Sequence, residues 1–407
     1  MTGDYERTLA YLQARLPMFS RIGKAAYKAD LDNTHALMRM LDHPERGLKC
    51  VHVAGTNGKG STSHMLASVL QEAGYRTGLH TSPHLTDFRE RIRINGEMIP
   101  REAVVAFVEK HKATFEPMAP SFFEWSVALT LHWFREQHTD IAVIETGLGG
   151  RLDSTNVVTP EVSVITNIGW DHADLLGGSL EAIAREKAGI IKAGVPVVVG
   201  EAEGAVARIF AEKALEVGAP IHPVDQRAPQ PYALDLAGAH QGRNARTVLE
   251  TLEQLRALGW RITEENAARG LAHTCTNTGF AGRWQTIAHA PLTIVDVGHN
   301  EDGLRVVNQM LAITPHDHLR IVLGTVKDKD IGRMLAQMPR EATYHFCKAD
   351  IPRGLEAVEL AARAGAVGLH GTVHGSVREA LANARKLAGA GDLVLVTGSV
   401  FVVAEAL

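Results

Sequence analysis

Residues 50–65 read CVHVAGTNGKGSTSHM, and this stretch decides the fold. An apolar run that ends at Ala54 predicts a buried strand, a glycine-rich loop follows, and a helix is expected to open near Ser61. Glycines let backbone N–H groups close around phosphate oxygens, and the helix N-terminus adds a partial positive charge. Lys59 can reach the β and γ phosphates, and the Ser61 hydroxyl can ligate Mg²⁺. The stretch therefore predicts a nucleotide-binding unit.

The loop departs from the usual spacing G-x-x-x-x-G-K-[ST], because Gly60 separates Lys59 from Ser61. The structural alternative is a glycine-rich turn without a ligand, which a strand before it and a helix after it disfavour. From the loop alone, kinases and GTPases remain open beside other nucleotide-dependent enzymes.

Short apolar runs alternate with helical patterns along the chain, which predicts parallel sheets covered by helices on both faces. The expected strands of the first part are CVHVAG (50–55), IAVIET (141–146), VSVITN (162–167) and VPVVVG (195–200). A long helix is expected at 243–259, and after residue 282 a fresh alternation begins with LTIVDVG, RIVLGTV, TYHFCK and DLVLVTG. We therefore expect an α/β protein of two domains: a P-loop-type parallel-sheet ATPase domain at 1–282, then a smaller Rossmann-like α/β domain at 283–407.

Composition argues against several classes of protein. The chain has 407 residues, too many for one ordinary core, and a formal net charge of −4 without a basic block. Nucleic acid and acidic membrane surfaces are therefore not expected as partners. Three distant cysteines, Cys50, Cys275 and Cys347, indicate a reducing compartment rather than disulfides or structural zinc. Residues 1–17 lack a secretory pattern, and no apolar run approaches the roughly 18 residues of a membrane span, so we expect a cytoplasmic protein.

Two further side chains follow expected strands, where ligands bind to open α/β sheets. Glu145 ends the strand IAVIE, and His172 comes just after VSVITNIGWD. With Ser61 they could form a Mg²⁺ site, although Mg²⁺ alone favours oxygen ligands. A capping or core role for His172 and a structural role for Glu145 remain open. Lys187, in AREKAGIIKAG, is by default a solvated surface lysine.

Nine segments, taken together, resemble the bifunctional dihydrofolate synthase/folylpolyglutamate synthase family of the Mur ligase superfamily. They occur in the order of the family: AGTNGKGS, TSPHLTDFRERIRING, FFEWSVAL, IETGLGGRLDSTN, DH(x)DLLG, REKAGI, GRWQ, DVGHN and VTGS. The resemblance implies an ATP-dependent amide ligase that adds L-glutamate to 7,8-dihydropteroate and to tetrahydrofolate. The reaction would pass through an acyl phosphate and release ADP and phosphate. The resemblance also implies two Mg²⁺ ions, a monovalent cation such as K⁺, and a monomer.

The resemblance assigns roles to individual residues. The implied ATP contacts are Gly58, Lys59, Gly60, Ser61, Asn244, Arg283 and Asp296. The implied metal ligands are Ser61, Glu145, His172 and Lys187, the last as a carbamate that turns a cation into an oxygen ligand. The implied substrate contacts are Ser82, Phe123, Glu124, Arg151, Leu152 and Asp153. The implied catalytic residues are Lys59, Lys187 and His299. Without the resemblance, Asp296 and His299 are polar residues at a strand end.

Three alternatives remain. A cell-wall Mur ligase carries a nucleotide-sugar-binding domain of about a hundred residues before the phosphate loop, whereas 54 residues precede Gly55 here. A P-loop switch or transport ATPase does not explain the pterin-type motifs or the second domain. A monofunctional folylpolyglutamate synthase, or another Mur-type amide ligase, is compatible with most of the motifs, and the balance of the two activities is not readable from the sequence.

Overall fold

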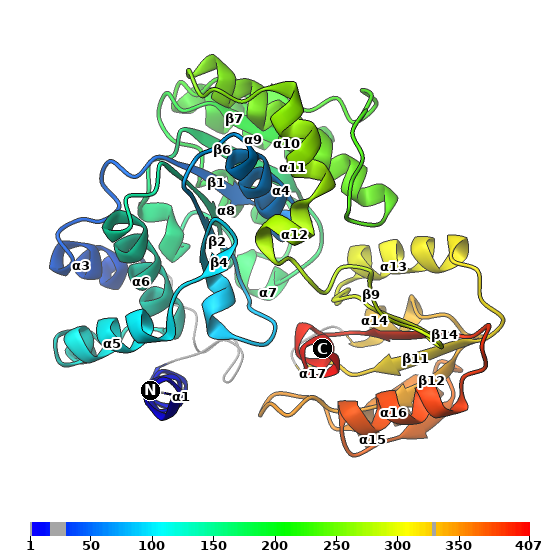
Figure 1. The fold of residues 1–407 in the computed structure, drawn as a ribbon. Helices are drawn as coiled ribbons and strands as arrows, with labels where there is room; N and C mark the ends of the chain where they lie inside the picture. Colours follow the sequence, from blue (N-terminus) through cyan, green and yellow to red (C-terminus); the bar gives the residue numbers. More distant parts are fainter. Residues whose placement is uncertain (1, 17–29, 328–330) are drawn as a thin grey trace. The chain divides into compact units, whose positions relative to one another are not determined.

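The computed structural model describes residues 2–16, 30–327 and 331–407 and divides into two compact units (Figure 1). Unit 1 comprises Met1–Asp235 and Ala239–Phe280, and unit 2 comprises Leu236–Gly238 and Ala281–Leu407. Each contains a mainly parallel sheet, which confirms the predicted α/β class. Across the described ranges, no helix is long and apolar enough to span a lipid bilayer.

The sheet of unit 1 has eight strands in the order β4-β3-β2-β5-β1-β6-β7-β8 among the described residues. From β2 to β8 all neighbours are parallel, and β3 and β4 add an antiparallel edge. The strands are β1 (Cys50–Ala54), β2 (Thr77–His80), β3 (Ile92–Ile94), β4 (Glu97–Met98), β5 (Ile141–Glu145), β6 (Val162–Asn167), β7 (Val197–Glu201) and β8 (Ile221–Pro223).

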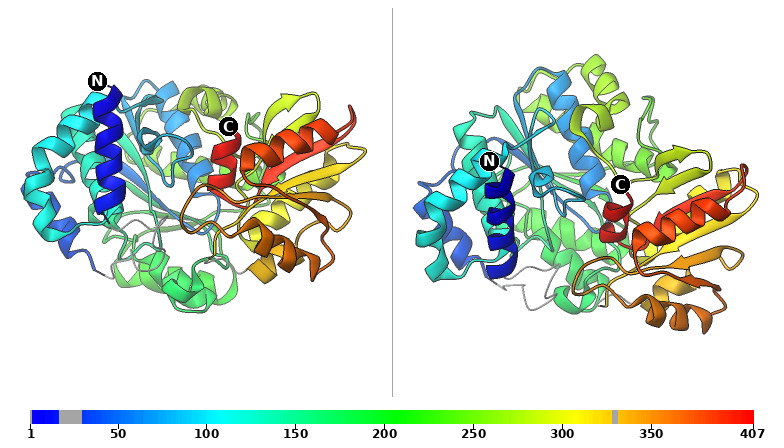
Figure 2. Two further views of the ribbon diagram at one scale, coloured as in Figure 1. Left: turned by 90° about the horizontal axis from the view of Figure 1, so that it is seen from below. Right: turned by 60° about the horizontal axis from the view of Figure 1, so that its bottom comes forward.

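Helices cover this sheet, and every residue of β1 and β5 is buried, as expected for central parallel strands. The α-helices of unit 1 are α1 (Thr2–Arg15), α3 (Asp32–Met40), α4 (Lys59–Glu72), α5 (Arg101–Phe115), α6 (Phe122–Glu136), α7 (Ala173–Leu176), α8 (Leu180–Ala188), α9 (Gly204–Glu216), α10 (Ala239–Ala257), α11 (Glu264–Ala272) and α12 (Thr274–Thr278). Short 3₁₀ helices are η2 (Phe88–Arg91), η3 (Glu116–Met118) and η4 (Ser154–Val157). Helix α4 packs beside α10, α11 and α12 (Figure 1), and α1 packs against α5 (Figure 2).

Unit 2 has a six-stranded sheet in the order β13-β12-β11-β14-β10-β9 within the described ranges. Only β9 is antiparallel to its neighbour. The strands are β9 (Gln285–His289), β10 (Leu292–Val295), β11 (Leu319–Leu323), β12 (Thr343–Phe346), β13 (Gly371–Val373) and β14 (Leu393–Thr397). The helices are α13 (Glu301–Ile313), α14 (Ile331–Ala336), α15 (Ala357–Gly365), α16 (Val377–Leu387) and α17 (Val400–Ala406), with α13 on one face and α15 and α16 on the other (Figure 1).

Among the described residues, the sequence prediction missed the strands β2, β3, β4, β8, β9 and β13, and it placed the start of one helix too late. Between the first two expected strands the structure has β2, β3 and β4 beside the helices α4, α5 and α6. These strands are two to four residues long, so they lack the apolar run that marks a central strand. The long helix expected from residue 243 begins at Ala239 in α10, since residues 239–242 continue the helix rather than the preceding loop.

Candidate functional site

The loop between β1 and α4 turns through two glycines with positive φ, 150° at Gly55 and 82° at Gly58. A Cβ atom on Gly55 would lie 1.8 Å from Oγ1 of Thr166, and one on Gly58 would lie 2.4 Å from Oδ1 of Asn244. Neither position has room for a side chain, and both φ values favour glycine. The structure thus brings Asn244, from α10, against the predicted phosphate loop.

The end of β6 holds this loop in place. The backbone N–H groups of Thr56 and Asn57 donate to the main-chain and side-chain oxygens of Asn167, at 2.9 and 2.8 Å. The hydroxyl of Thr166 donates to the carbonyl of Asn57 at 2.6 Å, and Thr56 and Gly169 exchange two hydrogen bonds. Sequence reasoning did not single out Thr166 or Asn167, because a polar strand end becomes informative only when its neighbouring strand is known.

Two lysines lie at the loop. Lys187 in α8 is only 4% exposed, and its Nζ donates to the carbonyl of Gly55 at 2.7 Å. Burial, and next the charge of Lys59, lowers the pKa of Lys187 to about 7. Lys59 opens α4, and its Nζ donates to the carbonyl of Thr56 at 3.3 Å. The residues around Lys187 alone favoured a surface lysine, and that interpretation was wrong.

Two of the predicted metal ligands, Glu145 and Ser61, lie on elements that meet near the loop. Glu145, at the end of β5, is 4% exposed. Its Oε2 lies 4.0 Å from the position that a Cβ atom on Gly60 would occupy. The same oxygen accepts a hydrogen bond from the backbone N–H of Ser82 at 3.0 Å. Ser61 is buried in the first turn of α4. A buried carboxylate, a buried hydroxyl and the loop therefore converge at the carboxyl ends of β1 and β5.

His172 follows β6 with a positive φ of 51°, and its Nε2 lies 3.8 Å from Oδ1 of Asp171. In the described parts of the chain, no three His, Cys, Asp or Glu side chains are grouped to hold a metal ion. The predicted set includes only two side chains of these types, Glu145 and His172, and it stays a prediction.

The side chains predicted to bind a pterin gather at the start of α6 and in the loop after β5. A Cβ atom on Gly147 would lie 2.6 Å from the ring of Phe123, so the absence of a side chain at Gly147 leaves room for this ring. Glu124 is buried, and with Ser121 it forms a capping box, in which Ser121 N–H donates to Oε2 of Glu124 at 2.5 Å. One oxygen of Glu124 is thus engaged by its own helix.

In the loop after β5, Arg151 is exposed and pairs with Glu186 at 2.8 Å, while Leu152 is half-buried. Asp153 is buried and accepts hydrogen bonds from the N–H of Leu148 at 2.8 Å and the N–H of Thr155 at 3.0 Å. Burial raises the pKa of the Asp153 carboxyl, which these bonds oppose. Asp153 therefore shapes the turn that carries Arg151 and Leu152.

The predicted residues of unit 2 lie together at the start of β9 and the end of β10. Asp296 is 8% exposed and accepts hydrogen bonds from the N–H groups of Trp284 and Gly298, both at 2.8 Å. Burial raises the pKa of its carboxyl, and the charge of Arg283 opposes this rise. Nδ1 of His299 lies 3.0 Å from the carbonyl oxygen of Val297.

Two buried arginines, Arg91 and Arg93, were missed by the sequence interpretation. Arg91, at the end of η2, is 8% exposed; its Nε donates to Nδ1 of His84 at 2.8 Å, and its guanidinium lies 5.4 Å from the ring centroid of Phe122. Burial lowers the pKa of Arg91 to about 10, and the charge of Glu145 opposes this. Among the described residues, no carboxylate lies within ion-pair distance of Arg91. The motif RERIRI contains three arginines, and nothing in it distinguishes the two buried ones.

The phosphate loop on a parallel sheet, followed by a second α/β unit, defines a ligase of the Mur type. The Mur ligase middle domain matches residues 53–249, and the glutamate ligase domain of Mur ligases matches residues 282–400.

Individual relatives narrow this class. The chain is 36% identical to the dihydrofolate synthase/folylpolyglutamate synthase of Bacillus subtilis, over 86% of this chain and 88% of the relative. It is 35% identical to a probable bifunctional folylpolyglutamate synthase/dihydropteroate synthase of Haloferax volcanii, of which it spans about half, 48%. The structure of Escherichia coli FolC in complex with DHPP and ADP is similar, with a TM-score of 0.87 and 30% identity over 99% of this chain and 96% of that one. The chain therefore belongs to the dihydrofolate synthase/folylpolyglutamate synthase family of ATP-dependent amide ligases.

Proposed function

We propose that this chain joins L-glutamate to 7,8-dihydropteroate, forming dihydrofolate, and to tetrahydrofolate, forming folylpolyglutamates. The observation that supports this best is the arrangement at the phosphate loop, where Lys59, buried Lys187 and Asn244 all contact the loop between β1 and α4. The Lys59 ammonium and a loop of backbone N–H groups suit the phosphates of ATP. Residues 1–282 would bind ATP and the pterin, and residues 283–407 would act on the glutamate side.

In the proposed reaction the pteroate or folate carboxylate attacks the γ-phosphate of ATP. Lys59 and the N-terminus of α4 stabilise the charge on the phosphate oxygens as the bond to ADP breaks. The glutamate amine then attacks the acyl phosphate, loses a proton, and expels phosphate to leave an amide. His299 and Asp296 would act near the phosphate, and exclusion of water would protect the acyl phosphate from hydrolysis.

The donor set suits Mg²⁺, because Glu145 and Ser61 supply buried oxygens beside Gly60. Carbamylation of Lys187 would add two further oxygens, and His172 an imidazole. When bound, Mg²⁺ would neutralise negative charge on the phosphate oxygens. A pair of Mg²⁺ ions and a K⁺ ion belong to the same proposal.

The decisive experiment is ADP release by the full chain with Mg²⁺, ATP and glutamate, comparing dihydropteroate, tetrahydrofolate and no acceptor. Release with both pterins is expected, together with a product that is one glutamate heavier by mass spectrometry. Release with tetrahydrofolate alone would favour the second candidate, a monofunctional synthase, a possibility raised by the 32% identical folylpolyglutamate synthase of Lacticaseibacillus casei. Release that ignores both pterins would refute the folate proposal. A monomer in the cytoplasm is the expected state.

We also propose that Arg91 binds the carboxylate of the pterin substrate. A buried guanidinium without a carboxylate partner is a suitable site for an anion. Arg91→Met is expected to raise the KM for dihydropteroate about tenfold or more, as expected for the loss of a buried charged hydrogen bond, and to leave the KM for ATP nearly unchanged. Steady-state kinetics with each substrate varied in turn would measure both values.

Arg93→Met is the matched control, because Arg93 is also buried, at 9% exposure, two residues further along. Its guanidinium donates to the carbonyl of Gly96, so the substitution removes a second buried arginine of the same motif. Equal effects of the two substitutions on the KM for dihydropteroate would contradict a specific role for Arg91.

A further inference from the structure

An aromatic ring with no assigned role lies against the phosphate loop. A Cβ on Gly60 would meet Cε2 and Cζ of Phe280 at 3.7 and 3.8 Å, and Oε2 of Glu145 at 4.0 Å. Gly60 is the second residue of α4, so both groups lie beside the first turn of that helix. Phe280 is only half-buried.

His64, four residues after Gly60 on α4, packs against the ring of Phe280. The two rings stack with their centroids 4.2 Å apart and an interplanar angle of 27°. His64 is 5% exposed, and its Nδ1 lies 2.7 Å from the hydroxyl oxygen of Thr278. That hydroxyl donates to the carbonyl of Thr274 at 2.6 Å, so it accepts the proton of Nδ1. The imidazole is therefore fixed in its orientation beneath the ring.

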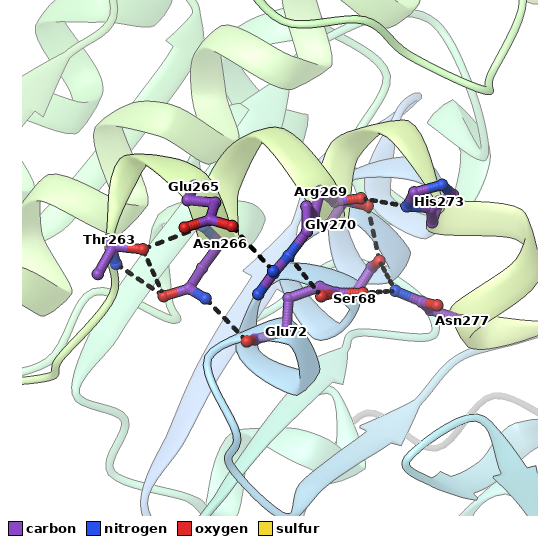
Figure 3. A network of polar contacts seen from close by, with 9 residues as sticks. All are labelled: Ser68, Glu72, Thr263, Glu265, Asn266, Arg269, Gly270, His273 and Asn277. Atoms are coloured by element: carbon purple, nitrogen blue, oxygen red, sulfur yellow. Dashed lines mark hydrogen bonds and ion pairs between the residues drawn. The ribbon is translucent and has the colours of Figure 1, made fainter.

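The segment before Phe280 is tied to α4 by side chains that point toward one another in Figure 3. Nδ2 of Asn277 donates to Oγ of Ser68 at 3.1 Å and to Oε1 of Glu72 at 2.9 Å. Ser68 in turn donates to the carbonyl of Gly270 at 2.6 Å, where α11 approaches α4 closely. Helix α12 thus has a fixed position on the phosphate-loop helix.

Gly279 then turns the chain back toward the loop. It caps α12 with a φ of 65°, and a Cβ there would lie 3.0 Å from the guanidinium of Arg93. A larger residue would be strained and would meet Arg93. The hydrogen bonds of α12, the turn at Gly279 and the His64 stack all determine the place of one ring.

We propose that Phe280 is a positioning residue for the phosphate loop, and that His64 acts through it. The ring limits the movement of Gly60, whose N–H lies in the first turn of α4, where orphan N–H groups face an anion. The inference rests on the proposed nucleotide site and adds a determinant of nucleotide affinity outside the glycine–lysine motif.

The test is the affinity of the full chain for ADP by isothermal titration calorimetry, together with the KM values for ATP and glutamate. Phe280→Ala is expected to weaken ADP about tenfold, equivalent to about 1.4 kcal/mol, and to raise the KM for ATP with little change in the KM for glutamate. Phe280→Tyr keeps the ring and is expected to restore ADP affinity. His64→Ala is expected to weaken ADP less, and the double variant no more than Phe280→Ala alone, because residues acting through one contact are not additive.

Phe107→Leu is the control for lost packing, since Phe107 is a buried ring of α5 in the core of the same unit. It is expected to lower the unfolding temperature and to keep ADP affinity. Unchanged ADP affinity in Phe280→Ala, or additive effects of the two alanines, would overturn the inference. If the alanine variant does not fold, Phe280→Leu gives the same comparison. Wild-type protein that binds no ADP would refute the proposed function instead.

Discussion

Lys59→Ala is expected to lower kcat for ADP release about a thousandfold. This is the loss of rate that is typical when one well-placed contact to the transition state is removed. The lysine opens α4, and its Nζ donates to the carbonyl of Thr56, within its own loop. Its charge is therefore held beside the loop where the γ-phosphate is proposed to lie. Single-turnover measurements at saturating ATP and dihydropteroate would separate this loss from weaker binding.

Lys49→Ala is the matched control. Lys49 precedes β1 on the same stretch of chain, but its side chain is 58% exposed and pairs with Glu161 at 2.7 Å. It is expected to keep full activity. Lys59→Arg retains the charge and is still expected to be impaired, because a planar guanidinium does not replace a compact ammonium at a phosphate. Wild-type rates in Lys59→Ala would exclude the loop as the site of phosphoryl transfer.

The central strands could be predicted from sequence, whereas the short edge strands could not. β1, β5 and β6 are buried on both faces and therefore appear as apolar runs. β2 reads TGLH, and the Nδ1 of its buried His80 meets the hydroxyl of Thr130 on α6. Such a strand is polar in sequence, and only its tertiary partners make it part of the core.

The residues of the candidate site could likewise be predicted from the sequence only in part. Glycines and a lysine within six residues of sequence predict a phosphate loop, because their spacing is local. Asn244 contacts Gly58 from a distant helix, and no local pattern indicates that contact. Arg91 lies in a motif rich in charge, where sequence cannot distinguish a buried cation from a solvated one. Packing makes that distinction, so these residues become visible only in the fold.

Lys187→Ala is expected to reduce kcat about a hundredfold or more, comparable to the loss of other buried charge contacts in active sites. Its Nζ is buried against the carbonyl of Gly55, and its pKa of about 7 is far below the ordinary 10.5. The lowered pKa makes the neutral amine accessible near neutral pH, and the neutral amine is the form that can take up CO₂. The resulting carbamate would place oxygens beside the phosphate loop.

The lowered pKa of Lys187 also fixes the sign of two pH effects. Between pH 7 and 10.5 the unfolded lysine binds a proton that the folded one does not, so this group makes the free energy of unfolding rise with pH in that window. Carbamylation should increase as pH rises through 7, and with it activity in buffer that contains bicarbonate. Carbon-13 NMR with labelled bicarbonate should show a carbamate signal in the wild type that is absent from Lys187→Ala.

Lys192→Ala is the matched control for Lys187, because its Nζ also donates to a backbone carbonyl, that of Asn156 at 2.9 Å. It is expected to retain both the carbamate signal and most of the activity.

Added formate or acetate should partly restore Lys187→Ala by supplying the missing oxygens, and should do nothing for Lys59→Ala. A wild type without a carbamate signal, together with no rescue, would mean that Lys187 acts as a cation at the phosphates. In that case Lys187→Arg would keep much of the activity, whereas a carbamate role predicts that arginine is as damaging as alanine.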